Sequence, residues 1–197
     1  MNVQIKSSHG IAVMPIDTRL LAQRIIFVEG DINHEMADLF LKQTLLLCKE
    51  DANKPIDVII NSPGGEISAG LLMYDCIQSS KAPMRMYCAG KAYSMAAILF
   101  ASGNNGRFMF PHSELLLHEP RLGGEIGGNV SSIQSVSESL MNIRNKVNGI
   151  LAEHTGKTVK QIEKATAYDH FFSPEESISF GLADEIIDLG KLIGGMI

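Results

Sequence analysis

The chain has 197 residues, 45% of them hydrophobic, which fits a single domain over residues 1–197 with a sizeable core. A formal net charge of −5 argues against nucleic acid or an anionic membrane as the main partner, and no apolar run approaches the roughly 20 residues of a membrane span. The start of the chain lacks the apolar segment of a signal peptide, and the three cysteines have no metal-ligand spacing. We therefore predict a cytoplasmic protein with reduced thiols and no metal site.

Strands and helices alternate in the first half of the chain. Residues 1–15 lack a clear period and predict an arm or a hairpin. Apolar and β-branched runs predict strands at 24–28, 56–60 and 84–89, with shorter ones at 108–110 and 115–118. Apolar residues at helical spacing predict helices from a cap at Asp31 or Asn33 to Leu47, and from Glu66 to Ile77. This βαβα order predicts an α/β fold with a parallel sheet.

The second half of the chain carries a long helix with a narrow apolar stripe. Residues 123–128 are too rich in glycine to form a stable strand on their own. Apolar residues then recur in steps of three and four, at Ile133, Val136, Leu140, Ile143, Val147 and Ile150. A helix of about 20 residues is some 30 Å long. Two arrangements stay open: the helix lies across its own sheet, or it projects and packs on its counterpart in another subunit.

Ser94 stands where an apolar strand gives way to a helix rich in alanine and leucine. One interpretation is a plain helix cap. The other is a nucleophile at the positive end of a helix dipole, where a developing oxyanion is stabilised. A serine hydroxyl needs a neighbouring base to take its proton.

His118 is the histidine best placed to be that base, because it ends the apolar run 115–117 and open α/β sheets place their sites at strand ends. A structural histidine is the alternative. Asp169 lies among aromatic neighbours between two helical segments, where a carboxylate needs a partner, and it is a candidate to orient the base. Capping the following helix is its other role, but Ser173 suits that better.

An oxyanion hole needs backbone N–H groups that point into the site. The turn after Pro63 supplies Gly64 and Gly65, whose conformational freedom allows close approach, and the helix start supplies Met95. The chain has no G-x-S-x-G elbow and no phosphate-binding loop. The residues by themselves therefore lead to a serine hydrolase and no further.

Several segments in a fixed order resemble the ClpP family, the proteolytic subunits of the Clp protease. The resemblance covers residues 19–188. Its pieces are Arg24-Ile25-Ile26-Phe27, Ile60-Asn61-Ser62-Pro63-Gly64-Gly65, Ser94-Met95, His118-Glu119-Pro120 with Leu122-Gly123-Gly124, and Phe172-Ser173-Pro174-Glu175-Glu176 with Gly181-Leu182-Ala183-Asp184. It implies a crotonase-like α/β fold with repeated β-β-α units and a protruding handle helix.

The resemblance implies a serine-type endopeptidase that hydrolyses unfolded polypeptides inside a barrel. Ser94 would be the nucleophile, His118 the general base and Asp169 its orienting acid. The N–H groups of Gly65 and Met95 would form the oxyanion hole. The strand that pairs with extended substrate would comprise Gly123, Gly124, Glu125, Ile126 and Gly127.

The resemblance also implies an assembly and a partner. Two heptameric rings would stack, with residues 1–15 as an axial arm and about 123–152 as the handle through which the rings meet. The partner would be an AAA+ Clp ATPase, an unfoldase that feeds in polypeptides. ATP would bind that unfoldase, so we predict no cofactor on this chain. The rings would be homo-oligomeric or would include a second ClpP.

Six positions depart from the pattern of that family. Tyr93 and Ala96 flank the serine segment where alanine and glycine are usual. Glu119 follows the base where glutamine is usual, and a carboxylate there would favour the protonated imidazole. Tyr168 replaces an arginine that commonly makes a ring-to-ring ion pair. Ile59 and Ser79 replace aromatic residues that usually grip the unfoldase. These departures are typical of a divergent paralogue with altered partner preference.

Two other functions stay in view. The first is a weakly active or structural subunit of mixed rings, which the departures at Glu119 and Tyr168 favour. The second is a crotonase-type acyl-CoA hydratase or isomerase, which shares the fold. Such enzymes use carboxylates as acid and base and need no serine–histidine pair, so the residues favour the peptidase.

Overall fold

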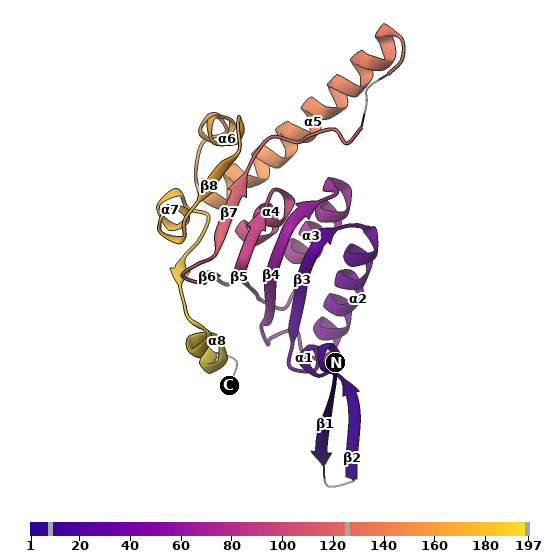
Figure 1. Cartoon of the computed structure of the whole chain (residues 1–197), viewed down its shortest axis with the longest axis vertical. Coiled ribbons are helices and arrows are strands. Elements are labelled where there is room, and N and C mark those ends of the chain that lie inside the picture. Colours follow the sequence, from indigo (N-terminus) through magenta and orange to yellow (C-terminus); the bar gives the residue numbers. More distant parts are fainter. Residues whose placement is uncertain (8–9, 125–126, 196–197) are drawn as a thin grey trace.

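The computed structural model describes residues 1–7, 10–124 and 127–195. The chain begins with a hairpin in which β1 (Asn2–Ser7) pairs antiparallel with β2 (Gly10–Pro15). Figure 1 shows this hairpin extending away from the rest of the molecule, joined to it through the short helix α1 (Ile16–Leu21). Of the arm and the hairpin that the sequence left open for residues 1–15, the structure has the hairpin.

A mainly parallel sheet forms the centre of the fold. Its strands are β3 (Ile25–Ile32), β4 (Ile56–Gly65), β5 (Met84–Tyr93), β6 (Arg107–Met109), β7 (Glu114–Leu117), β8 (His170–Phe172) and β9 (Glu185–Ile186). The order β3-β4-β5-β6-β9 is parallel throughout. Strand β7 pairs parallel with the end of β5, and β8 pairs antiparallel with β7. The prediction of an α/β fold with a parallel sheet is confirmed.

Three helices lie across one face of the sheet, α2 (His34–Glu50), α3 (Ile67–Ser79) and α4 (Met95–Ala101). Helix α2 packs on α3, and α3 packs on α4 (Figure 1). Of the two predicted caps for α2, the structure uses Asn33, whose side chain accepts a hydrogen bond from the Met36 N–H. Every residue of α4 is buried, so the element that follows Ser94 is fixed in the core.

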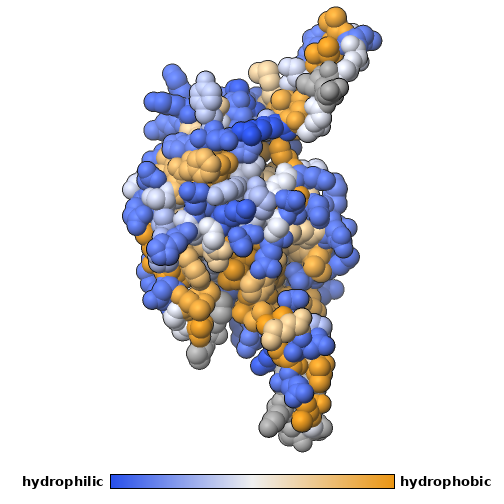
Figure 2. Space-filling model, viewed as in Figure 1, coloured by the Kyte–Doolittle hydropathy of each residue, from blue (hydrophilic) through white to orange (hydrophobic). Residues whose placement is uncertain are grey.

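The long helix α5 (Val130–Thr155) packs on its own domain at one end and projects from it at the other. Near its end Val147 and Leu151 are buried in the core, where α5 packs on α4. Its first half extends beyond the sheet (Figure 1) and keeps Ile133 and Met141 exposed. Figure 2 shows hydrophobic residues on this projecting end and on the hairpin at the opposite end of the molecule. The protruding helix expected from the resemblance is therefore present.

The C-terminal elements are α6 (Val159–Thr166), α7 (Pro174–Phe180) and α8 (Leu189–Gly195). Arg107 links the C-terminal ends of α5 and α7. Its guanidinium donates to the carbonyls of His154, at 3.0 Å, and Gly181, at 2.7 Å, and also pairs with Asp184. Among the described residues, no helix combines the length and the apolar character needed to cross a membrane.

The candidate active site

Strand register brings the predicted catalytic residues to one edge of the sheet. Tyr93, the last residue of β5, pairs with Leu116 of β7, and the N–H of Ser94 donates to the Leu116 carbonyl at 2.8 Å. His118 directly follows β7. In the antiparallel β7–β8 pair Leu117 lies opposite His170, so the next step of the same register sets His118 opposite Asp169.

Ser94 has a backbone conformation that a simple helix cap does not require. Its φ is +55° and its ψ −121°, a sparsely populated region that costs a residue with a side chain on the order of 1–3 kcal/mol. Its side chain makes no capping hydrogen bond to α4. The plain cap is therefore not what the structure shows. Strain held at a strand-to-helix corner is typical of functional sites, and here it sets the hydroxyl at the start of a buried helix.

Gly64 comes against this corner, and Gly65 against Ile32 of β3, at distances that only glycine permits. A Cβ on Gly64 would lie 2.6 Å from the Tyr93 carbonyl oxygen and 2.9 Å from the Ser94 Cβ, and its φ is +93°. A Cβ on Gly65 would lie 2.2 Å from the Ile32 carbonyl oxygen. The β4 turn is thus packed directly beside the serine, as a partner in an oxyanion hole has to be.

Met95, the second predicted oxyanion donor, is the first residue of α4 and is buried. The N–H groups in the first turn of a helix have no acceptor within the helix. The Met95 N–H also lies 3.1 Å from the position a Gly64 Cβ would take. The two predicted donors therefore come from neighbouring segments.

A cleft of about 990 Å³ opens beside the serine and the histidine. The predicted site residues on its wall are Ser94, His118, Gly65 and Gly123, and Arg121 joins them. A narrow cavity of about 20 Å³ adjoins Ser94 and His118, with Met95, Leu117 and Asn148 among its lining residues. Asn148 is only 1% exposed, and both polar atoms of its amide lack a hydrogen-bond partner.

The His118 ring is half-buried, and its Nδ1 atom has no hydrogen-bond partner. Burial lowers the pKa of His118 below its ordinary value of 6.5, and the charge of Arg121 lowers it further. Asp169 and the backbone of Glu119 act in the opposite direction. The expectation that the Glu119 carboxylate would favour the protonated ring was wrong. That carboxylate lies 3.3 Å from an Arg144 guanidinium nitrogen, so its charge is met by Arg144 of α5.

Asp169 does not sit in the apolar surroundings that the sequence suggested. Its side chain is 43% exposed, and its carboxylate forms an ion pair with the Arg121 guanidinium. Ser173 caps α7 by accepting from the Glu176 N–H, so Asp169 is free of that task, as predicted. Arg121 was not predicted as a site residue. The signal was a single basic residue between Pro120 and the glycine-rich segment.

Tyr93, which departs from the family pattern beside Ser94, makes contacts that were not predicted. Its hydroxyl donates to the Glu114 carboxylate at 2.5 Å, and this hydrogen bond is the main cause that raises the pKa of Tyr93 to about 12. Its ring also meets the Phe171 ring edge to face, with centroids 6.0 Å apart. Tyr93 therefore ties the strand before Ser94 to the strand after Asp169.

The predicted substrate-pairing segment is only partly described. Gly123, Gly124 and Gly127 are exposed and belong to no strand, which agrees with the expectation that this segment forms no stable strand alone. Glu125 and Ile126 lie outside the described residues. Within the described ranges, no three histidine, cysteine or acidic side chains gather as metal ligands.

Comparison with known families identifies the fold and the general chemistry. The family model described as Clp protease matches residues 8–190, which is most of the chain. Members of this family are serine peptidases that assemble into oligomers and work with Clp ATPases. The fold, the strained serine at the end of β5 and the extent of this match together show that the chain belongs to the Clp protease family.

Proposed function

We propose that this protein is the proteolytic subunit of an ATP-dependent Clp protease, a serine endopeptidase that cuts unfolded polypeptides inside a closed chamber. One observation carries the proposal: Ser94, which has a positive φ, and the half-buried His118 line one cleft, and the turn at Gly64 packs against Ser94. Each supplies a part that acyl transfer needs: a nucleophile, a base and backbone donors.

In the proposed reaction the Ser94 hydroxyl attacks the scissile carbonyl carbon while His118 takes its proton. The lowered pKa of His118 keeps the ring neutral near pH 7, which is the form that accepts a proton. The negative charge that develops on the carbonyl oxygen is stabilised by the N–H groups of Gly65 and Met95. His118 then returns the proton to the leaving amine, and an acyl-enzyme forms on Ser94.

A water molecule completes the cycle. His118 removes a proton from it as its oxygen attacks the acyl carbon. The second tetrahedral intermediate collapses as His118 returns that proton to the Ser94 oxygen, which releases the acid and restores the Ser94 hydroxyl. Asp169 acts on the imidazolium of both steps by accepting a hydrogen bond from Nδ1. Extended substrate would lie along residues 123–127 and pair through its backbone, which accepts many sequences.

The proposed assembly is two stacked heptameric rings, of this chain alone or with a second ClpP. The projecting half of α5 is exposed and carries Ile133 and Met141, which suits contact between rings. The β1–β2 hairpin extends from the opposite end of the molecule (Figure 1) and suits the axial arm. An AAA+ Clp ATPase would bind ATP and deliver substrate, and this chain would need no cofactor.

The first experiment is hydrolysis of a short fluorogenic peptide by the assembled wild-type protein and by Ser94→Ala, with assembly checked by sedimentation. We expect turnover that disappears in the variant. A fluorophosphonate should modify Ser94 and no other serine, as found by peptide mass spectrometry. Turnover that survives in Ser94→Ala, or labelling spread over several serines, would contradict the proposed role of Ser94.

One observation favours a second function, a weakly active or structural subunit of mixed rings. The Asp169 carboxylate pairs with Arg121 while His118 Nδ1 has no partner, so the orienting bond is not made in this conformation. An assembled barrel with no turnover, which becomes active only beside a second ClpP, would identify that function.

A further inference from the structure

Two observations about His118 and Asp169 do not fit a completed catalytic triad. The register of β7 and β8 sets these residues opposite one another, and opposed residues of an antiparallel pair have Cβ atoms about 5 Å apart. The Asp169 carboxylate is nevertheless bonded to Arg121. The buried Nδ1 of His118, the atom that would donate to this carboxylate, has no partner.

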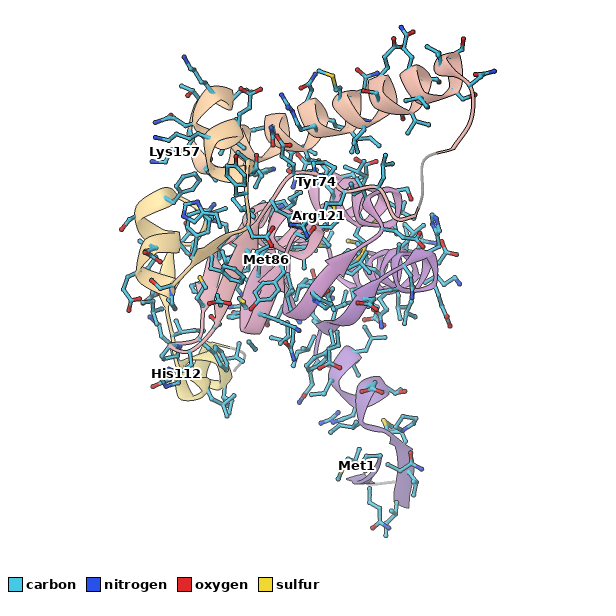
Figure 3. All side chains as sticks on the ribbon, turned by 45° about the horizontal axis from the view of Figure 1, so that its top comes forward. Met1, Tyr74, Met86, His112, Arg121 and Lys157 are labelled. Atoms are coloured by element: carbon cyan, nitrogen blue, oxygen red, sulfur yellow. The ribbon has the colours of Figure 1, made fainter. Side chains whose placement is uncertain are left out.

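Arg121 is placed to cause this arrangement. It follows His118 by three residues, lines the same cleft as Ser94 and His118, and lies between α5 and the sheet (Figure 3). Its side chain is 66% exposed, so the guanidinium is free to move into solvent at little cost. A planar guanidinium is a strong competitor for a carboxylate because it donates through several N–H groups.

Resting on the proposed function, we propose that Arg121 is an inhibitory positioning residue that competes with His118 for the Asp169 carboxylate. In the arrangement observed here Arg121 holds Asp169, and His118 works without its orienting acid. When Arg121 releases the carboxylate, Asp169 accepts from Nδ1 and fixes the ring with Nε2 toward Ser94. No new bond type is involved, only an exchange of hydrogen-bond donors at one carboxylate.

The charges around the ring make the competition measurable through pH. Arg121 lowers the pKa of His118 and Asp169 raises it. Removing Arg121 and engaging Asp169 therefore both raise this pKa. Since the neutral ring is the active base, the acid limb of the rate profile moves to higher pH while the plateau above it rises. A residue with only a structural role would lower the plateau and leave the limb in place.

The test is the second-order rate of fluorophosphonate labelling of Ser94 from pH 5 to 9 in the assembled protein. Labelling reports the serine even where peptide turnover is slow. We expect Arg121→Met to label about fivefold faster at pH 8, because an exposed ion pair shifts a two-state equilibrium by about this factor. The gain should shrink below the midpoint, and the midpoint should lie at higher pH. Arg121→Lys keeps the positive charge but loses the planar guanidinium. Its labelling rate should lie between those of the wild type and Arg121→Met.

Two controls separate this idea from others. Arg19→Met removes an exposed arginine of α1 and should label like the wild type. Adding Asp169→Asn to Arg121→Met should abolish the gain, since the gain depends on that carboxylate. A gain that survives in the double variant, or an unchanged rate and midpoint in Arg121→Met, overturns the proposal.

The kinetics of peptide hydrolysis test whether Arg121 instead contacts the substrate. A higher KM with an unchanged kcat in Arg121→Met would make Arg121 a substrate contact, which also overturns the proposal. Failure of the proposed function itself looks different, because then Ser94 would not be labelled selectively in any variant.

Discussion

The contact between Gly64 and the Ser94 corner makes the sharpest prediction about this site. Gly64→Ala adds one methyl group at a φ of +93°, which costs roughly 1–2 kcal/mol. That methyl would also stand 2.6 Å from the Tyr93 carbonyl oxygen and 2.9 Å from the Ser94 Cβ. Overlap with a packed backbone costs typically about 1–3 kcal/mol. We therefore expect the free energy of unfolding to fall by about 2–5 kcal/mol.

The loss of kcat should be larger than the loss of folding stability alone would cause, because the segments that must move carry the proposed nucleophile and both proposed oxyanion donors. A displacement of the order of 1 Å at a reacting group costs on the order of 100-fold in rate. The assay is kcat on a fluorogenic peptide, read beside the denaturant midpoint and the sedimentation profile. We expect an assembled but nearly inactive Gly64→Ala protein.

The matched control is Gly30→Ala. Gly30 also has a left-handed φ, +75°, but a Cβ there would meet nothing within 4 Å. It should carry the conformational cost alone, roughly 1–2 kcal/mol, and keep most of its activity. If the two variants were equal in kcat and in denaturant midpoint, the close approach of Gly64 to Ser94 would have no energetic consequence.

Three further predictions follow from other contacts. Arg107→Met should lower the free energy of unfolding by about 3 kcal/mol in chemical denaturation, because the half-buried carbonyls of His154 and Gly181 lose a charged donor. A loss under about 1 kcal/mol would mean that water takes the place of the guanidinium as donor. Asn148→Leu should raise the denaturant midpoint, since it removes a buried amide whose two ends are unpaired at a cost of about 1–3 kcal/mol; a lower midpoint would show that the amide is bonded in the assembled protein. The acid limb of wild-type kcat/KM should have its midpoint below pH 6.5, because burial lowers the pKa of His118 and activity falls as the ring gains a proton; a midpoint above 6.5 would contradict this assignment.

The sequence by itself determined the fold class and the candidate catalytic residues. Period-two and period-3.6 patterns identified the main strands and helices because burial of one face imposes those periods. Strand ends of a parallel sheet meet at one edge, so Ser94 and His118 were predictable as neighbours from their positions alone. The glycines after Pro63 and the cap at Ser173 were equally local, since each depends on the conformation of a few adjacent residues.

Only the tertiary structure decided how those residues are connected. The pairing of Asp169 with Arg121, and of Glu119 with Arg144, joins residues 48 and 25 positions apart in the chain, and no local pattern encodes such a partner. The same holds for the lowered pKa of His118, which depends on burial beneath distant segments. Side-chain charges act through space over a few ångströms, whereas sequence spacing reports only the order of the chain. The candidate catalytic residues could therefore be predicted from the sequence, whereas their ion-pair partners and their burial could not.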